Sequence, residues 1–244
     1  MNVRIVIKNL MSESKKVDLN ITYCSHKATK YAVERWHYSG VLPAGKSVKV
    51  GVWEDGDFVG VCMFGMGAGN CTNGKQYGLK ERAEVAELTR LALKEHKTPC
   101  TKIIARAIKL LKKQSPNLRL IISFSDRMGQ NHHGGIYQAG NWIYTGDFVG
   151  DGGFIVRGKK MHNRSVHAKG WKQTLEWLQT NIDPHAKRGK TRKHRYLMPL
   201  DDEMKKRISP LSKPYPKREK LGDDPDHGNS DGATPILTLH KKVA

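Results

Sequence analysis

The segment Trp36-His37-Tyr38-Ser39-Gly40 places an indole, an imidazole, a phenol and a hydroxyl together, just after a predicted helix. A histidine whose pKa lies near neutrality can act as a general base, and a tyrosine can donate a hydrogen bond or protonate a leaving group. We therefore consider His37 and Tyr38 as candidate catalytic residues. The alternative is a Trp/Tyr core anchor beside an exposed histidine.

A second polar group, Ser125 and Asp126, follows the apolar run Leu118–Phe124. Such a run is typical of a strand buried on both faces, and open α/β sheets bind ligands at the carboxyl ends of their strands. Ser125 and Asp126 are therefore candidate catalytic residues, although Asp126 could instead cap the following turn. The adjacent His132 and His133 diverge and lack a helical metal-binding spacing, so the sequence leaves open whether a metal is bound.

A third group surrounds the start of a strongly predicted helix. Thr98-Pro99 has the pattern of an N-cap followed by proline, and apolar residues repeat at helical spacing through 100–113. Helix N-termini bind anions, which favours a nucleotide or pyrophosphate near residue 99, although α/β proteins often carry capped helices that bind no ligand. The predicted cofactor-binding residues are Glu87, Thr89, Arg90, Leu91, Thr98, Thr101, Lys102, Tyr137 and Asn141.

A scaffold of alternating strands and helices must position these residues. Strands are expected at 18–25, 48–53, 58–66, 84–93, 118–124, 144–149 and 154–157, and helices at 26–36, 100–113, 136–142 and 171–181. This order predicts an α/β fold with a mixed central sheet flanked by helices.

The composition indicates a soluble protein with a polyanionic partner. The 244 residues carry a net charge of +20, which makes nucleic acid the first partner to consider. No apolar stretch approaches the roughly 20 residues of a membrane span and the start does not resemble a signal peptide, so we expect a cytoplasmic protein. The four cysteines are widely spaced, which indicates free thiols rather than a disulfide framework.

The positive charge is concentrated in the C-terminal third. Residues 157–220 contain 19 Lys and Arg against 6 Asp and Glu. We predict an N-terminal extension at 1–17 with Met11 as a possible true start, a catalytic domain at 18–182, a basic DNA-contacting extension at 183–220 and a flexible tail at 221–244. The predicted DNA-binding residues are Lys187, Arg188, Lys190, Arg192, Lys193 and Arg195, together with Trp36 and Trp142.

Several motifs occur here in the same order as in the Mom proteins of Mu-like bacteriophages. They are WHYSGVLPAGK (36–46), AELTRLAL (86–93), TPCTKIIARAIKLLKK (98–113), IISFSD (121–126), GGIYQAGNWIYTG (134–146) and KHRYLMPLD (193–201). The chain resembles this family over roughly residues 18–218.

The resemblance implies an enzyme that adds a methylcarbamoyl (acetamido) group to N6 of adenine in double-stranded phage DNA. The modified DNA would evade host restriction enzymes, and the protein would act in the cytoplasm of the infected bacterial host. The family is similar in fold to the GNAT N-acetyltransferases, which implies that acyl-CoA lies along 88–93 and its pyrophosphate against 94–101. Acetyltransferases usually carry a glycine-rich loop there, whereas 94–100 contains no glycine.

The implied product leaves the donor open. Simple acetyl transfer from acetyl-CoA would give an amide, so an N–CH2 bond needs another activated two-carbon or glycine-derived donor, or a rearrangement assisted by a metal such as iron or by a radical. The target adenine must be flipped out of the duplex. Arg90 would hold the anionic donor, Asp126 or His37 would remove the N6 proton, and Asn141 and Ser125 would recognise the base edge. The candidates for stacking are Trp36, Tyr38, Tyr137 and Trp142.

Two other functions are compatible with parts of the sequence. A non-catalytic basic DNA-binding protein would explain the charge but not the polar strand ends. A GNAT acetyltransferase of an amine or protein substrate would explain the strand ends but not the charge. The oligomeric state stays open, with a dimer among the options.

Overall fold

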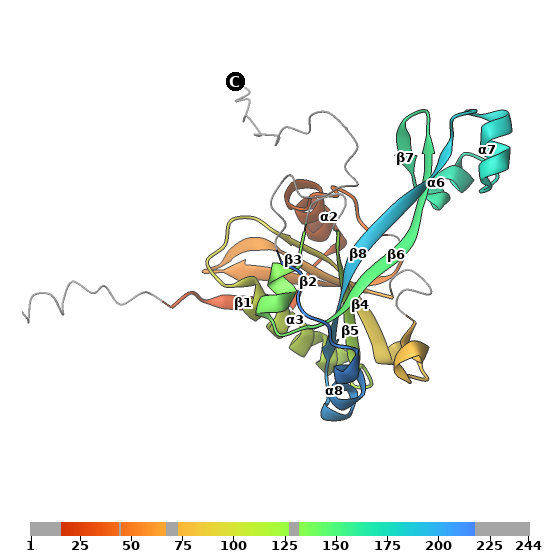
Figure 1. The fold of residues 1–244 in the computed structure, drawn as a ribbon. Helices are drawn as coiled ribbons and strands as arrows, with labels where there is room; N and C mark the ends of the chain where they lie inside the picture. Colours follow the sequence, from red (N-terminus) through yellow and green to blue (C-terminus); the bar gives the residue numbers. More distant parts are fainter. Residues whose placement is uncertain (1–15, 44, 67–72, 127–131, 218–244) are drawn as a thin grey trace, which may run out of the picture.

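The structure is a computed structural model that describes residues 16–43, 45–66, 73–126 and 132–217. Met11, most of the predicted N-terminal extension and the predicted tail at 221–244 lie outside the described residues. The chain forms one eight-stranded sheet in the order β1-β2-β3-β4-β5-β8-β6-β7 (Figure 1). The strands are β1 Leu19–Tyr23, β2 Ser47–Glu54, β3 Asp57–Gly65, β4 Val85–Leu93, β5 Leu120–Asp126, β6 Ile143–Val156, β7 Lys159–Met161 and β8 Lys187–Pro199.

Helices cover the sheet on both faces. Only the β4–β5 pair is parallel and the other six are antiparallel, so the predicted α/β class with a mixed central sheet flanked by helices is confirmed. The α-helices are α2 His26–Trp36, α3 Cys100–Gln114, α5 Gly135–Ala139, α6 Asn163–Ala168, α7 Leu175–Asn181 and α8 Asp202–Ile208, and the 3-10 helices are η2 Gly74–Tyr77, η3 Arg82–Glu84 and η4 Ser209–Leu211.

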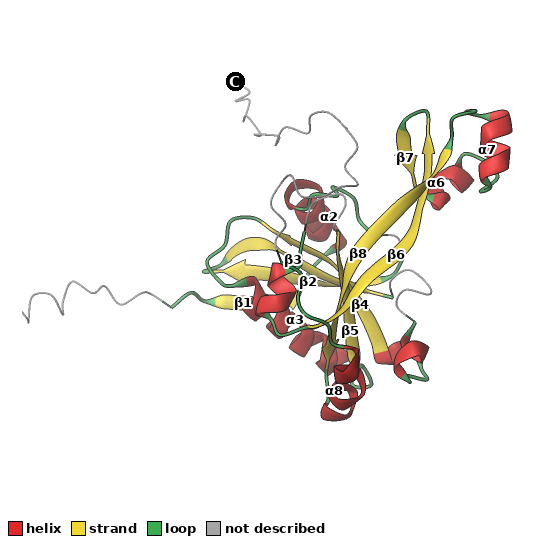
Figure 2. Cartoon of the chain, in the orientation of Figure 1, coloured by secondary structure: helices red, strands yellow, loops and turns green. Residues whose placement is uncertain are grey.

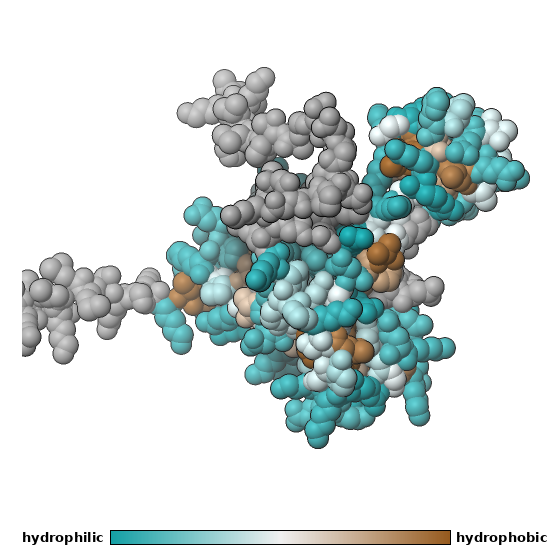
Figure 3. Space-filling view, in the orientation of Figure 1, coloured by the Kyte–Doolittle hydropathy of each residue, from teal (hydrophilic) through white to brown (hydrophobic). Residues whose placement is uncertain are grey.

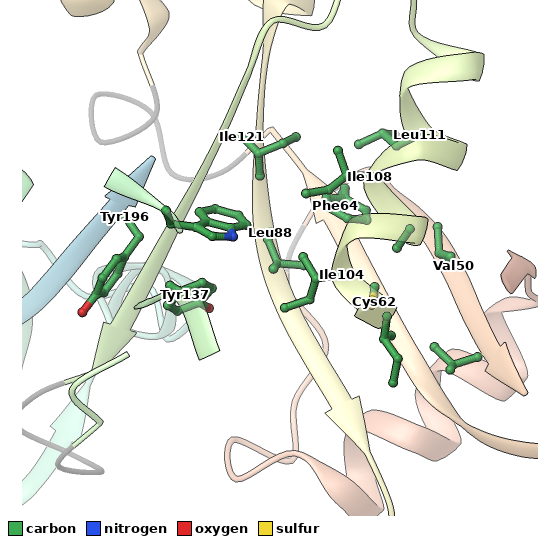
Figure 4. Close-up of a cluster of buried hydrophobic side chains, with 14 of the residues drawn as sticks. Val50, Cys62, Phe64, Leu88, Ile104, Ile108, Leu111, Ile121, Tyr137 and Tyr196 are labelled. Atoms are coloured by element: carbon green, nitrogen blue, oxygen red, sulfur yellow. The ribbon is translucent and has the colours of Figure 1, made fainter. Parts of the chain in front are cut away.

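The main core lies between the sheet and α3. Ile103, Ile104, Ala107, Ile108 and Leu111 are all buried, as their helical spacing predicted. They belong to one apolar cluster, in which Tyr137 and Tyr196 lie at the opposite end from Leu111 (Figure 4). On the other face of the sheet, α2 and α8 cover two smaller clusters.

A buried carboxylate binds the loop that precedes α3. Glu54, at the end of β2, accepts hydrogen bonds from the backbone N–H groups of Lys97 and Thr98, each at 2.7 Å. Its side chain is only 5% exposed. Burial raises the pKa of Glu54, but the donors of Lys97 and Thr98 outweigh burial, and the pKa lies below its ordinary value. The Glu54 carboxylate therefore occupies the position at this loop that the anion of a ligand would otherwise take.

Glu54→Gln should lower the free energy of unfolding by about 2 kcal/mol, because the amide NH2 cannot accept a hydrogen bond and leaves one buried N–H unpaired. A carboxylate with a lowered pKa stabilises the fold above its unfolded pKa, and this contribution is lost as the pH falls through the folded pKa. The variant should therefore also show a shallower acid limb in urea denaturation. Glu34→Gln, on the exposed side of α2, is the matched control; an equal loss in both would refute the role of Glu54.

A long two-stranded arm extends from the body of the protein. β6 and β8 pair from Ile143↔Leu197 to Ile155↔Lys187, and their outer ends carry β7, α6 and α7 (Figure 2). A separate apolar cluster fills this end of the arm, and the lobe it forms stands apart from the body in space-filling view (Figure 3). Its fully buried members are Phe154, Val156, Val166, Leu178 and Ala186.

The structure corrects the predicted boundary at 182/183. β8 does not follow the catalytic domain as an extension; it is an interior strand of the sheet, between β5 and β6. Its first half is a run of basic residues that lacks the alternation of apolar and polar side chains by which a half-buried strand is recognised. The strand forms because both of its edges are paired by neighbouring strands.

Three element boundaries are corrected as well. The helix predicted at 136–142 ends at Ala139, and the helix predicted at 171–181 begins at Leu175. The strands predicted at 144–149 and 154–157 form a single strand, β6, with two register shifts. Gly150, Gly152 and Gly153 therefore lie at a bulge within one continuous strand.

Candidate active site

The two parallel strands at the centre of the sheet separate toward their carboxyl ends. Their pairing covers only Val85–Glu87 of β4 and Leu120–Ile122 of β5, although both strands continue for several residues. A cavity of about 240 Å³ lies at this opening. It is lined by residues 88–91 of β4, 124–126 of β5, 36–38 at the end of α2 and 132–137 around the start of α5. Four segments far apart in the sequence therefore meet at one place.

His37 lies at this cavity with a defined tautomer. The backbone N–H of Ser39 donates to Nδ1 of His37 at 3.1 Å, and Ser39 Oγ lies 2.8 Å from the same nitrogen. Because a backbone N–H can only donate, Nδ1 is the acceptor and the neutral ring carries its proton on Nε2. Burial, followed by the charges of Arg90 and His132, lowers the pKa of His37 to about 4. The ring is thus neutral at pH 7 and presents an N–H donor at Nε2.

Aromatic rings continue the wall from His37 across the cavity. The ring of Tyr38 stacks on His37 at a centroid distance of 4.3 Å and lies 5.9 Å from His132. Burial and the nearby charge of Asp126 raise the pKa of Tyr38. The phenol is therefore a proton donor at neutral pH, beside a carboxylate that can accept a proton.

A buried hydroxyl pair fixes the inner end of the opening. Ser123 Oγ lies 2.9 Å from the carbonyl oxygen of Leu88 and 2.8 Å from Oη of Tyr137. Burial raises the pKa of Tyr137 to about 12. Ser123 thus connects β5 to β4 and to α5, so it holds the separated strands at their spacing.

Ser125 supplies a polar atom with no partner. Its side chain is 6% exposed and lines the cavity, and Oγ makes no hydrogen bond within the part of the chain that the structure describes. A buried hydroxyl without a partner is uncommon in native proteins and costs free energy unless a ligand or water satisfies it. Ser125 therefore marks the cavity as a place that a polar ligand can occupy.

Comparison with known families identifies the family of the chain. Residues 18–217 match the Mom protein family. The chain belongs to that family. No curated protein matches the chain.

Solved structures similar to this Mom-family chain include acetyltransferases. One is the GNAT-family acetyltransferase from Streptococcus pneumoniae, with 12% identity, 75% of this chain and 100% of that chain covered, and a TM-score of 0.41. Another is aminoglycoside 6'-acetyltransferase type Ii, with 12% identity, 75% and 97% covered, and a TM-score of 0.40. A third, yncA from Salmonella typhimurium, is named as an acetyltransferase and was solved with acetyl-CoA, with 10% identity, 75% and 95% covered, and a TM-score of 0.40.

The cavity brings together all four predicted catalytic residues of this Mom-family protein, but only part of the predicted cofactor set. His37, Tyr38, Ser125 and Asp126 line it, as do four predicted cofactor residues and one of the two predicted DNA-contacting tryptophans: Thr89, Arg90, Leu91, Tyr137 and Trp36. Thr98, Thr101 and Lys102 lie at the start of α3 and do not line it.

The backbone N–H groups before α3 are not available as the predicted anion site. Two backbone N–H groups that a pyrophosphate would use, those of Lys97 and Thr98, already bind Glu54. Asn141 also lies away from the cavity, at the turn after α5, where its φ is +57°. The sequence pattern could not reveal Glu54, which is more than 40 residues earlier in the chain.

Trp142 is not a stacking platform. Its side chain is 1% exposed and packs in the main core, 5.1 Å from the ring of Tyr137. A flipped base could not reach it without disrupting that core, so the DNA-binding prediction for Trp142 is wrong. The error follows from the helix end: the predicted helix includes Trp142, whereas α5 stops at Ala139 and Trp142 enters the sheet layer instead.

The predicted DNA-binding residues of β8 fall into two groups, an exposed group along the arm and a group next to the body of the protein. Lys187, Arg188, Lys190 and Arg192 are exposed along the arm, and Arg192 lies 3.7 Å from Asp147. Lys193 pairs in register with Asp126. Arg195 instead donates to Thr145 Oγ1 at 2.7 Å and to Gln76 Oε1 at 3.3 Å, so its guanidinium bridges elements of the body.

The sequence did not identify Phe124 and Gly134 as part of the cavity wall. Gly134 has a φ of +75°, and a Cβ there would lie 2.4 Å from the ring of Tyr196. Only glycine fits this close approach. The Gly134-Gly135 pair was the available signal, since consecutive glycines before a helix often mark such a contact.

The described residues contain no group of three or more His, Cys, Asp or Glu side chains placed to hold a metal ion. The described helices are also too short or too polar to cross a membrane.

Proposed function

We propose that this Mom-family protein is a transferase that adds a methylcarbamoyl group to N6 of adenine in double-stranded phage DNA, which protects that DNA from restriction enzymes. The observation that carries the proposal is the cavity between β4 and β5, where His37, Tyr38, Ser125 and Asp126 meet. The net charge of +20 supports a polyanionic substrate.

The cavity suits the reacting end of an activated two-carbon donor. The donor of this reaction is an activated two-carbon or glycine-derived compound whose CH2 carbon, beside the carboxamide, is the electrophile; direct transfer from acetyl-CoA would give an amide instead. Arg90 supplies a cation at this cavity, and Ser125 offers a hydroxyl that a carbonyl or amide of the donor can pair. The Lys97 and Thr98 amides do not serve as a pyrophosphate cradle, so Arg90 is the group we assign to the donor's charge. No residue set that fits a metal centre is found within the described ranges, and we assign no step to one.

Asp126 and His37 take different roles in this scheme. Nδ1 of His37 already accepts a hydrogen bond and the proton is on Nε2, so we assign His37 as a hydrogen-bond donor to the donor's carboxamide oxygen or to the leaving group. Asp126 is then the general base. The bond from N6 to the donor carbon forms as the bond to the leaving group breaks, the leaving group takes the electron pair, and one N6 proton passes to the Asp126 carboxylate. Tyr38 protonates the leaving group.

Mass spectrometry of nucleosides tests the proposal. Plasmid DNA from cells that express the chain should contain an adenosine species heavier by a carbamoylmethyl group, and DNA from cells that express Asp126→Asn should lack it. Wild-type DNA without a new base, together with tight duplex binding, would favour a non-catalytic DNA-binding protein. Acetylated amines or proteins in place of modified DNA would favour an acetyltransferase.

The lowered pKa of His37 predicts a pH effect on stability. The unfolded chain protonates this histidine near its ordinary pKa of about 6.5, whereas the folded chain does so near 4. Between these values the unfolded state binds more protons, so wild-type stability should fall as the pH falls from about 6.5 to about 4. His37→Gln keeps an N–H donor and should remove this part of the loss. Thermal unfolding at pH 4.5 and pH 7 measures it.

The exposed His26 provides the control for this measurement. His26→Gln should retain the wild-type difference in Tm between the two pH values. If His37→Gln and wild type show the same difference, His37 is not held neutral by the fold, and the donor role is refuted.

A further inference from the structure

A second cavity adjoins the active site on the side of the arm. It has a volume of about 590 Å³, within the range of small-molecule sites, and shares Phe124 and Asp126 with the first cavity. Glu87 of β4 also lines it, and the rest of the wall comes from the arm: Phe148, Gly150 and Gly152 of β6, Thr191 and Lys193 of β8, and Lys160, His162 and Asn163. Asp126, the proposed base, therefore stands where the two cavities meet.

Aromatic rings form one wall of this second cavity. The rings of Phe124 and Phe148 lie 5.7 Å apart at an angle of 58°, on strands that flank β8 from either side. At Gly150 a Cβ would come within 2.8 Å of the Phe148 ring, so the ring occupies the space that a side chain would fill. Flat apolar rings of this kind bind a nucleobase by stacking or edge contact.

Polar groups surround this wall. Glu87 and Asp126 supply carboxylate oxygens, which accept hydrogen bonds from an exocyclic amine, and Thr191 supplies a hydroxyl that can donate to a ring nitrogen. Lys160 and Lys193 supply positive charge at the cavity. An exocyclic amine, a flat apolar face and a phosphate occur together in an adenine nucleotide.

The basic arm continues the cavity toward a duplex. Residues 157–193 contain 11 Lys and Arg against 2 Asp and Glu. From Lys193 to Lys187 the strand rises about 20 Å, at roughly 3.3 Å per residue. Exposed basic side chains along this length, Arg192, Lys190 and Arg188, can follow a phosphate backbone away from the site.

We propose that the second cavity holds the adenine flipped out of the duplex, while the first cavity holds the donor. The base lies against Phe124 and Phe148, its N6 amine is directed to Asp126 at the junction, and the arm lies along the DNA. This inference rests on the proposed function and specifies where its substrate binds.

Photolabelling with 8-azidoadenosine 5'-monophosphate tests this placement without requiring turnover. The full chain is irradiated with the probe, with and without excess deoxyadenosine monophosphate, and the labelled peptides are mapped by mass spectrometry. Saturable labelling should fall on the segments around Phe148, residues 160–163 and Thr191–Lys193. Thr191→Trp, which fills the cavity, should reduce it about tenfold or more.

Two further variants complete the test, one as a control for the added ring and one as a second change to the cavity wall. Val149→Trp adds the same ring at a neighbouring position that is 64% exposed, and it should label like wild type. Phe148→Leu removes an aromatic wall without filling the cavity, and it should also weaken labelling. If Thr191→Trp and Phe148→Leu both label like wild type, the second cavity is not the base site.

The outcomes separate this inference from the proposed function. Labelling confined to 36–38 and 132–137 would place the base in the first cavity and overturn the inference, as would the absence of saturable labelling. Labelling of the second cavity in a protein that leaves plasmid DNA unmodified would retain a purine site there and overturn the proposed reaction.

Discussion

Asp126→Asn should lower the rate of DNA modification by about 10²–10⁴-fold, the usual contribution of a general base. Asparagine has nearly the same shape but cannot accept the N6 proton at neutral pH. Asp126 lies at the end of β5 and lines both cavities. Among the described residues it is the only carboxylate that the two cavities share. The rate is measured as modified adenine per unit time on a defined duplex, with affinity for the same duplex measured in parallel.

Affinity should stay near the wild-type value, because the residues of the arm that we propose to contact phosphate are unchanged. Asp57→Asn, at the exposed start of β3, removes the same charge outside both cavities and should modify DNA like wild type. Activity of Asp126→Asn within a few-fold of wild type would assign the base to another residue.

Neutralising the arm should weaken DNA binding and change its response to salt. Lys187, Arg188, Lys190 and Arg192 are exposed on β8, and the removal of each phosphate-binding charge should reduce the slope of log K against log salt by about 0.9. Replacing all four with glutamine should lower duplex affinity about tenfold to hundredfold at physiological salt and flatten the slope by up to about 3.6. Fluorescence anisotropy over a salt series measures both.

The same charge change elsewhere is the control. Lys109 and Lys113 on α3 and Lys205 and Lys206 on α8 are also exposed but lie away from the arm. Their replacement with glutamine should leave the slope near wild type. Equal reductions in the two quadruple variants would show that net charge, rather than the arm, attracts DNA.

The spacing of apolar residues was sufficient to predict a helix or strand whose buried face can be recognised from its own sequence. The α3 helix follows from apolar residues at helical spacing, and β5 follows from a short apolar run with polar residues after it. The ordered motifs indicated the family, and the predicted catalytic residues His37, Tyr38, Ser125 and Asp126 line one cavity.

Contacts between residues far apart in the sequence determined three features that the spacing of apolar residues could not predict. Glu54 accepts hydrogen bonds from the backbone N–H groups of Lys97 and Thr98, which precede α3. Nothing in the sequence of 94–101 indicates that a carboxylate from β2 would reach these groups. Trp142 is buried because the chain leaves α5 and enters β6, so a residue with the right chemistry for stacking lies in the core. β8 is basic in sequence yet interior in the sheet, because its neighbours pair both edges.

The sequence by itself therefore determined the α/β class, the family, the basic character of the C-terminal third and most of the residues at the strand opening. Only the tertiary structure decided that β4 and β5 separate after Glu87, that an arm built from β6 and β8 adds a second cavity, and that Asp126 lies between the two. The physical reason is that side-chain type and helical or strand spacing act over a few residues. Cavities, by contrast, form where strands distant in sequence pair or fail to pair.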